Sequence, residues 1–479
     1  MFEIIHFLKN TIAKLNIPKI NILSHLSDII NPEILFSVIQ YIILVLIVIY
    51  VIFMLYVKVK HNFWAIQPVF HSYDFHYWLK LPFIIEPGHS GKKYVNFNNT
   101  QYYSLDSLKE NPEQCNNFIQ HIQKHYLREK ETSYIPNKNH ILSHFKPGNS
   151  LFILYYLEST LVGSITSRVV NSFVDGQHYH TFYVDYLCVH GDYRKKGVAP
   201  QLIETITYYQ RKHHKDVDIS LFKKENSSHW IISLVSYDTY FYETDRWNLS
   251  NYRETVVRNG TAVLPVNQEN TSLWLDFLKQ QREKNLNNTE NRIFQKNKNR
   301  TKNRKNKCFI QSNDDVLLSQ IKLGVYMVYM LVQIGTNVPV ACYIFKDSGT
   351  RYKLSNGNDT IGLEVQSCFK ITECDNDTFV DGFYHALFKV QQICEVSEKN
   401  ENSENSENSE KNEKNEKNEK LGKIPKYQML LFENISDNNI IRNNFLFNKK
   451  LCCGKMPTTF YFYNYATRSV KPEEIVVIL

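Results

Sequence analysis

Residues 183–210 of this 479-residue chain constrain its fold more than any other segment. Apolar and polar residues alternate over 183–189, which predicts a strand with one buried face. Apolar residues then recur every three to four positions over 202–209, as on one face of an amphipathic helix. Because the basic sequence RKKGVAP joins the two at 194–200, we predict a strand, a basic turn and a helix.

The turn between this strand and helix suits an anionic ligand. The first N–H groups of a helix have no partner within the helix, and the positive end of the helix dipole lies there. Gly197 would let the backbone come close to the anion, and the three cations at 194–196 add positive charge. A pyrophosphate group is therefore the ligand that this turn predicts.

Two nested resemblances rest on these residues. Arg-x-x-Gly-x-Ala after a strand resembles the acyl-CoA site of the GNAT acyltransferase superfamily. The sequence YLCVH at 186–190, followed by the basic turn and Leu-Ile, resembles the N-myristoyltransferase family more narrowly. That family has Phe where Tyr186 stands and a basic residue where Gly197 stands. The alternative is an ordinary strand-to-helix turn with solvated lysines.

Three further segments extend the resemblance. Residues 62–69 read NFWAIQPV, similar to a family segment that contacts the acyl-CoA, although a belt of aromatics beside a membrane is the alternative. Residues 238–242 resemble the family's Gly-Thr-x-x-Tyr segment at the acceptor-peptide groove, with Asp238 in place of Gly. Residues 454–465 resemble the family's C-terminal Gly-Asp-Gly region, with Lys455 and Met456 replacing its second and third residues.

The resemblance implies an α+β fold in which two GNAT-like halves form one continuous mixed sheet flanked by helices. It implies transfer of a fatty acyl group, myristoyl in that family, from acyl-CoA to the N-terminal glycine amine of a protein. The family uses its C-terminal carboxylate as general base, which gives that role to Leu479. The implied oxyanion donors are the backbone N–H groups of Tyr186 and Leu187. The implied acyl-CoA contacts are Phe63, Trp64, Leu187, Cys188, Val189, Arg194, Lys195, Lys196, Gly197, Val198 and Ala199, and the implied acceptor contacts are Tyr126, Thr239, Tyr242 and Gly454.

Two rival functions stay open at this point. The first is a related enzyme with a different acyl chain or amine acceptor, and the second is an inactive acyl-CoA-binding scaffold that recruits membrane or ribosome partners. The free C-terminus and the oxyanion strand favour an enzyme. Nine scattered cysteines without Cys-x-x-Cys pairs favour a reduced, metal-free protein with no tightly bound cofactor. We expect a monomer that uses myristoyl-CoA as co-substrate.

Residues 34–57 hold no charge, and 24 such residues are enough for a transmembrane helix. A cleaved signal peptide is disfavoured, because residues 1–33 precede this run and no small-residue cleavage site follows it. Lys58 and Lys60 favour a cytoplasmic C-terminal side, whereas three lysines before residue 20 favour the opposite orientation. Since acyl-CoA is cytosolic, we expect a single-pass membrane protein whose catalytic part faces the cytosol.

The rest of the chain divides by composition. Residues 58–278 are expected to form the acyl-CoA-binding half and residues 308–479 the acceptor-binding half. Between them, residues 279–307 contain 11 Lys and Arg against two Glu, a pattern that predicts a disordered insertion. This insertion would contact anionic lipid or ribosomal RNA, or be only a solvated loop. A second low-complexity insertion covers 395–420. Basic residues within 127–131 and at Lys455 predict an acceptor site without a strong demand for a downstream Lys.

Overall fold

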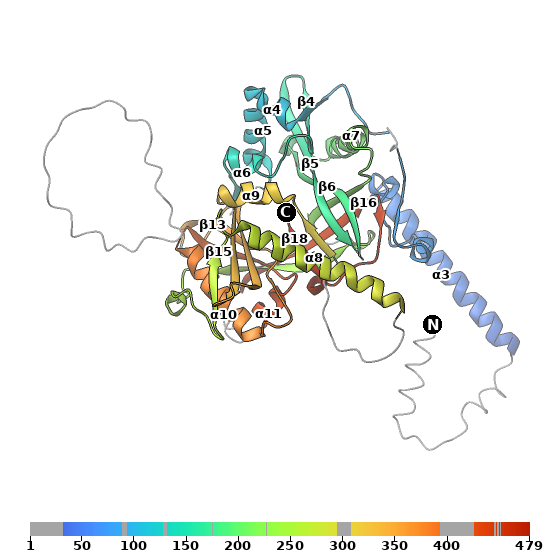
Figure 1. The fold of residues 1–479 in the computed structure, drawn as a ribbon. Coiled ribbons are helices and arrows are strands. Elements are labelled where there is room, and N and C mark those ends of the chain that lie inside the picture. The colour runs from blue at the N-terminus through green and yellow to red at the C-terminus, as the bar shows by residue number, and fades with distance from the viewer. Residues whose placement is uncertain are drawn as a thin grey trace, which may run out of the picture. The chain divides into compact units, whose positions relative to one another are not determined.

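The computed structural model describes residues 32–88, 93–127, 132–174, 176–226, 228–294, 308–392, 426–444, 447, 450 and 452–479 (Figure 1). The chain divides into two compact units, residues 1–67 and residues 68–479. Residues 395–420, predicted to be a low-complexity insertion, lie outside the described residues. So do residues 128–131, whose basic side chains are predicted to influence the acceptor site.

The first unit is built on one long helix. Helix α3 (Pro32–Lys60) contains the 25-residue stretch Phe36–Lys60, which is long and apolar enough to span a membrane, and an 18-residue window within it has a mean hydropathy of 3.0. At 1.5 Å per residue such a helix covers about 37 Å, more than the ~30 Å of a hydrocarbon core. A short helix, η1 (Trp64–Ile66), follows it.

The second unit is organised around a 16-stranded mixed sheet in the order β18-β10-β5-β6-β7-β16-β8-β15-β13-β12-β11-β9, with β2, β3, β4 and β14 attached beside this path. The strands are β2 (Thr100–Ser104), β3 (Thr132–Tyr134), β4 (Ser150–Leu157), β5 (Thr160–Val174), β6 (Gln177–Val189), β7 (Ile219–Glu225), β8 (Val235–Glu243), β9 (Thr261–Pro265), β10 (Cys308–Gln311), β11 (Tyr326–Gln333), β12 (Pro339–Lys353), β13 (Asp359–Val365), β14 (Phe369–Lys370), β15 (Tyr427–Glu433), β16 (Cys452–Tyr463) and β18 (Ile475–Ile478). Strands β1 (Phe83–Ile84) and β17 (Tyr465–Ala466) form a separate pair.

Helices flank this sheet. They are α4 (Leu105–Lys109), α5 (Pro112–His125), α6 (Lys138–Leu142), α7 (Val198–His213), α8 (Thr271–Phe294), α9 (Asp314–Lys322), α10 (Asn376–Gln391) and α11 (Asn438–Arg442), with short helices η2 (Phe75–Leu79), η3 (Gly191–Tyr193), η4 (Ser250–Tyr252) and η5 (Pro472–Glu474). The α+β class with a continuous mixed sheet is thereby confirmed.

The first half of the sheet is covered on both faces because β4 is apolar at consecutive positions. Its even-numbered residues, such as Phe152, pack against Phe118 of α5, while its odd-numbered residues, such as Ile153, share a cluster with Leu202 of α7. Successive strand residues point to opposite faces, so a strand buried on both sides needs this uninterrupted apolar run.

The second half repeats the layout. On β12, Phe345 packs against Phe383 of α10, and the neighbouring Ile344 faces a cluster that contains Trp274 of α8. The halves also exchange strands: β10 of the second half pairs with β5, β18 pairs with β10, and β9 of the first half pairs with β11. Residues 68–479 therefore form one compact unit that crosses the expected boundary at 279–307.

Helix α8 corrects part of the disorder prediction. It continues to Phe294, so residues 279–294 are helical and not disordered. Its first turns are anchored by the buried residues Trp274, Phe277 and Leu278, and the Gln, Arg, Glu and Lys residues that follow are good helix formers. A packed start removes the cost of nucleation, and each added residue then extends an existing helix. Residues 295–307 lie outside the described part.

Candidate active site

Strands β6 and β7 separate at the centre of the sheet. They pair in parallel from Thr181 with Ile219 to Val184 with Phe222, and in the described structure the pairing stops there. Strand β6 continues for five more residues on β5 alone, to Val189. One edge of β6 is therefore left open over residues 185–189, where an extended ligand can lie against the backbone.

A β-bulge lies on this open segment. One residue of β5, Ile165, faces both Tyr186 and Leu187 on β6, because the register shifts by one position there. Tyr186 has a left-handed φ of 49°, and Ser164 Oγ donates to its carbonyl oxygen at 3.3 Å. The Tyr186 N–H donates to Asp185 Oδ1 at 2.8 Å, so a carboxylate already occupies one of the two expected oxyanion donors. Leu187, at the crest of the bulge, is 39% exposed.

The basic turn lies at the end of this strand. Helix α7 begins at Val198 with Gly197 as its N-cap, at a left-handed φ of 82°, and Gly197 offers no side chain to cap the first N–H groups. Arg194, Lys195, Lys196 and Gly197 are all exposed. The turn is held in place by Arg194, whose guanidinium donates at 3.2 Å to the carbonyl oxygens of Val189 and of His125 in α5. The predicted strand, turn and helix are thus confirmed, with cations around an uncapped helix start.

Helix α7 also sits close to the sheet. A Cβ atom on Gly163 of β5 would lie 3.0 Å from side-chain atoms of both Val198 and Leu202, so a larger residue would have to displace them. Ala199 is half-buried beside Val198. Close packing therefore fixes where the first turn of α7 points relative to β6.

Among the other residues predicted to contact acyl-CoA, Cys188 is buried, and burial raises the pKa of its thiol to about 12. A thiol with that pKa is protonated at neutral pH and does not act as a nucleophile. Phe63 and Trp64 contact each other edge to face, with ring centroids 5.3 Å apart. They belong to the first unit, so the structure does not place them relative to the basic turn.

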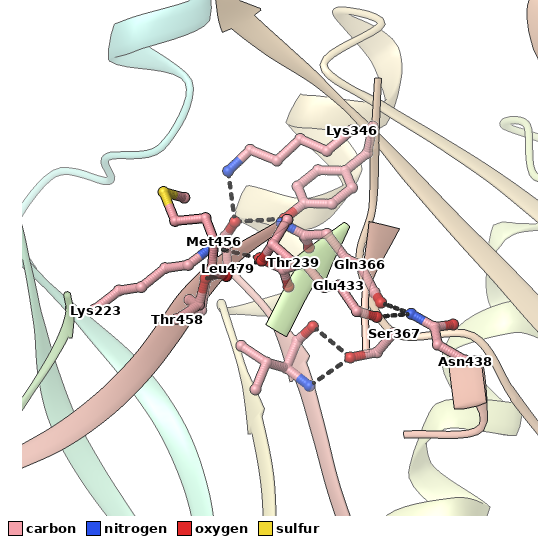
Figure 2. A network of polar contacts seen from close by, with 12 residues as sticks. Lys223, Thr239, Lys346, Gln366, Ser367, Glu433, Asn438, Met456, Thr458 and Leu479 are labelled. Carbon is pink, nitrogen blue, oxygen red and sulfur yellow. Dashed lines mark hydrogen bonds and ion pairs between the residues drawn. The ribbon is translucent and has the colours of Figure 1, made fainter. Parts of the chain in front are cut away.

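Leu479 is held at the buried end of β18. Its backbone oxygen accepts a hydrogen bond from the Lys346 ammonium at 2.9 Å (Figure 2). The same oxygen accepts a second hydrogen bond from the Tyr326 hydroxyl. Ser367 fixes the strand two residues earlier, because its hydroxyl accepts the N–H of Val477 at 2.9 Å and donates to the carbonyl of Val477 at 3.0 Å. Burial lowers the pKa of Lys346, and Glu364 opposes that shift. The last residue therefore lies in a fixed position beside a buried cation.

More charges lie on the strands between β18 and β12. Arg168 of β5 is 3.5 Å from Asp185 of β6, and Lys223 of β7 pairs with Glu433 of β15. Burial lowers the pKa of Lys223, but Glu433 and its neighbours Tyr237 and Glu364 together outweigh burial, so the pKa lies well above its ordinary value. Buried charges persist where each one has an opposite partner. Two ion pairs between sheet strands thus lie in this part of the sheet.

The predicted acceptor residues separate into two groups. Tyr126 donates to Asp185 Oδ1 at 3.2 Å and so joins the bulge, and Thr239 lies 2.9 Å from the Thr458 hydroxyl in the network of Figure 2. Tyr242 is three residues beyond Thr239 on the same strand and faces the opposite side, where it packs on Phe447 with ring centroids 5.0 Å apart. Burial raises the pKa of Tyr242 to about 12.

Gly454 pairs with Phe241 toward the far end of β8. Beside it, Lys455 Nζ lies 3.1 Å from Asp238 Oδ2. These are two of the positions at which the sequence departs from the family pattern, and here the two departures form an ion pair. Sequence reasoning missed this pairing because 217 residues separate the partners.

Sequence reasoning also missed Arg168, Tyr326 and Lys346. For Lys346 there was a usable signal, since a single lysine ends the apolar run 338–345. Among the described residues, no group of His, Cys, Asp and Glu is arranged to hold a metal ion.

A family model for the N-terminal domain of myristoyl-CoA:protein N-myristoyltransferase matches residues 91–225, which include β6, the basic turn and α7. Residues 91–225 are therefore similar to the N-terminal domain of the N-myristoyltransferases. The whole fold is similar to a structure of Saccharomyces cerevisiae N-myristoyltransferase with bound myristoyl-CoA, at a TM-score of 0.60 and 13% identity, covering 88% of this chain and 94% of the yeast chain. A second structure of the yeast protein with myristoyl-CoA gives a TM-score of 0.59 at 13% identity, over 86% and 94% of the two chains.

At this identity, the likeness establishes that the N-myristoyltransferase fold extends beyond the matched domain, across the greater part of the chain. No curated protein sequence matches this chain.

Proposed function

We propose that the protein transfers a fatty acyl group, myristoyl by the similarity of its domain, from acyl-CoA to the N-terminal glycine amine of a protein. The observation that carries this proposal is the open, bulged end of β6 leading into an exposed basic turn and an uncapped helix start, within the residues similar to the N-myristoyltransferase domain. That arrangement offers a backbone edge for a thioester and a cationic site for a pyrophosphate in one continuous segment.

On the donor side, the pyrophosphate of acyl-CoA binds at residues 194–199, and the pantetheine lies along residues 187–189 in the gap between β6 and β7. The thioester oxygen is stabilised at the bulge. Because Asp185 occupies the Tyr186 N–H, the Leu187 N–H carries most of this role unless the carboxylate moves. Phe63 and Trp64 complete the proposed acyl-CoA contacts.

On the acceptor side, the carboxylate of Leu479 takes a proton from the incoming ammonium. The amine nitrogen then attacks the thioester carbon, the carbon–sulfur bond breaks, and the nitrogen passes its extra proton to the departing sulfur, so that CoA leaves as a thiol. Lys346 and Tyr326 hold the carboxylate in place. Tyr126, Thr239 and Gly454 are the proposed acceptor contacts, whereas Tyr242 supports the strand from its opposite face.

We also propose that α3 anchors the protein as a single span, with residues 68–479 in the cytosol, and that the protein is a monomer. The length and apolarity of α3 support the span, and the use of acyl-CoA supports the orientation. The basic segment 279–307 has the charge to contact anionic lipid or ribosomal RNA. Full-length protein should stay in the membrane fraction after carbonate extraction, and its complete release would refute the anchor.

The decisive test of the activity uses full-length protein, a mixed pool of acyl-CoA donors, and a peptide with an N-terminal Gly. Mass spectrometry should find one acyl chain on the N-terminal amine, with the matched N-acetylated peptide left unmodified. Acylation of an internal lysine would assign a different acceptor. Binding of acyl-CoA without any product would favour the inactive scaffold.

A further inference from the structure

The short helix η2 (Phe75–Leu79) exposes an apolar surface that the proposed chemistry does not use. Phe75 is 63% exposed, Trp78 is 43% exposed and Leu79 is 89% exposed, the highest value for a large apolar side chain among the described residues of the second unit. Three such side chains within five residues are unusual on a surface that contacts only water. Lys80 follows them directly.

The packing and hydrogen bonds of the turn hold these side chains at the surface. Phe70, which is only 2% exposed, packs under Trp78 with ring centroids 5.1 Å apart. The turn itself is fixed by Asp74, whose carboxylate accepts hydrogen bonds at 3.0 Å from the backbone N–H and from the ring of His71. Because the layer beneath is already filled, the outer side chains stay on the surface.

The position of η2 in the sequence indicates what covers it. The second unit begins at Pro68, eight residues after Lys60 ends helix α3. Eight extended residues reach at most about 28 Å, so a membrane that holds α3 lies within that distance of the start of the unit. Tryptophan, phenylalanine and leucine followed by lysine are the side chains that favour the boundary between headgroups and acyl chains.

We propose that Phe75, Trp78 and Leu79 form a membrane-contact turn, which enters the interfacial layer of the bilayer that α3 spans. This inference rests on the proposed anchor and is independent of the acyl-transfer chemistry. It gives the catalytic unit a second attachment to the bilayer besides the covalent link. Lys80 would then lie at the level of the headgroups, where anionic lipid strengthens the contact.

The test uses full-length protein in nanodiscs whose phosphatidylcholine carries a photoactivatable group on the acyl chain. After illumination, mass spectrometry of peptides should find lipid adducts on residues 36–57 and also on residues 75–79. Ile334 and Val338, each 51% exposed in the loop between β11 and β12, are the matched control for exposure alone and should carry none. Adducts confined to 36–57, or equally frequent at 334–338, would overturn the proposal.

Variants sharpen the test without disturbing the core. Phe75→Ser with Leu79→Ser leaves the contact of Trp78 with Phe70 in place and should lower labelling of 75–79 by about 10-fold, with labelling of 36–57 unchanged. The matched double variant Ile334→Ser with Val338→Ser should label as the parent does. Unchanged labelling of 75–79 in the first variant would refute the apolar contact, and protection of this turn by an added protein and not by lipid would do the same.

Two further readouts keep the proposals separate. Adding phosphatidylserine to the nanodiscs should raise labelling of 75–79 in the parent and not in Lys80→Ser. An equal response of the two proteins would show that Lys80 does not contact the anionic headgroups. Acylation of a soluble peptide should stay within about twofold in the Phe75→Ser, Leu79→Ser variant, because the turn lies outside the proposed site. A parent protein that labels at 75–79 but acylates no peptide would instead count against the proposed function alone.

Discussion

The donor side and the acceptor side of the proposed active site are built in opposite ways. The donor side is one continuous segment, in which β6, the basic turn and α7 follow each other from Gln177 to His213. The acceptor side gathers residues from strands far apart in the chain, so that Lys346 reaches Leu479 across 133 positions and Tyr326 reaches it across 153. A local segment keeps its geometry through its own sequence, whereas an assembled site depends on the order and register of the whole sheet.

The two sides also hold their charges differently. The cations of the basic turn are exposed and face solvent or an anionic ligand. On the acceptor side, Arg168, Lys223 and Lys346 are partly or wholly buried near carboxylates on neighbouring strands. Removing one member of a buried pair leaves the other charge uncompensated, so substitutions there should alter catalysis more than binding.

The largest expected effect comes from the end of the chain. Adding two residues after Leu479 replaces the carboxylate with a neutral amide and should lower turnover by about 100-fold or more, the scale of general-base loss. Affinity for acyl-CoA should change little, since the basic turn is a separate segment. The measurement is single-turnover acyl transfer alongside calorimetry of donor binding.

Leu479→Met is the matched control for this change, because it retains a terminal carboxylate on a side chain of similar volume. Normal turnover in the extended protein would exclude the terminal carboxylate as base. Asp185, with its position at the bulge, would then be the next residue to test.

The next effect tests the donor side. Reversing two exposed charges, with Arg194→Glu and Lys196→Glu, should weaken acyl-CoA binding by roughly 10-fold or more, because each charge-assisted contact to a phosphate contributes on that scale. Lys212→Glu on the far end of the same helix changes charge without touching the turn. Equal losses in the two variants would mean that overall charge, and not this turn, attracts the donor.

Lys346 allows a pH test of the acceptor side. An adjacent ammonium favours the ionised form of a carboxylate and lowers its pKa, so Lys346→Met should raise the pKa of the Leu479 carboxylate. The acidic limb of turnover should then move upward by about one pH unit, with about 10-fold lower turnover near that limb. Because burial lowers the pKa of Lys346 itself, this difference should fade at a lower pH than for an exposed lysine.

Lys346→Arg retains the charge and should keep the parent's acidic limb. An unshifted limb in Lys346→Met would separate Lys346 from the ionisation of the base and leave it only a packing role.

The same contrast explains what the sequence predicted. The strand, turn and helix over 183–210 were predictable because alternation, helical spacing and Gly197 all act within a few residues. The α+β class followed from the resemblance. The helix over 279–294 was not predicted, because its stability comes from the packing of Trp274 against the sheet and not from its own polar composition.

The acceptor side was less predictable for the same reason. Thr239 and Tyr242 were assigned together from a local motif, yet strand alternation sends them to opposite faces. The contacts of Leu479 with Lys346 and Tyr326 depend on the sheet order, which single-sequence patterns do not contain. The ion pair between Asp238 and Lys455 likewise requires the register of β8 and β16.

That ion pair carries the smallest predicted effect. Lys455 is largely exposed, and its contact with Asp238 raises the pKa of its ammonium, so the two charges cancel at a rim of the proposed acceptor site. The parent enzyme should therefore accept peptides with and without a downstream Lys about equally. Lys455→Asp leaves two carboxylates together, which should favour a peptide with a downstream Lys by about threefold, as exposed charges usually do.

The charge swap Asp238→Lys with Lys455→Asp is the matched control, because it keeps the pair and reverses only its direction. It should show the parent's indifference to the downstream Lys, measured as the ratio of kcat/KM for two peptides that differ at that position alone. A strict Lys requirement in the parent would contradict this account, since a neutral rim cannot select a cation. If the preference for a downstream Lys appears in Lys455→Asp and vanishes in the charge swap, then the ion pair between β8 and β16 controls acceptor selection. That control would belong to the acceptor side, whose residues come together only when the whole sheet has folded.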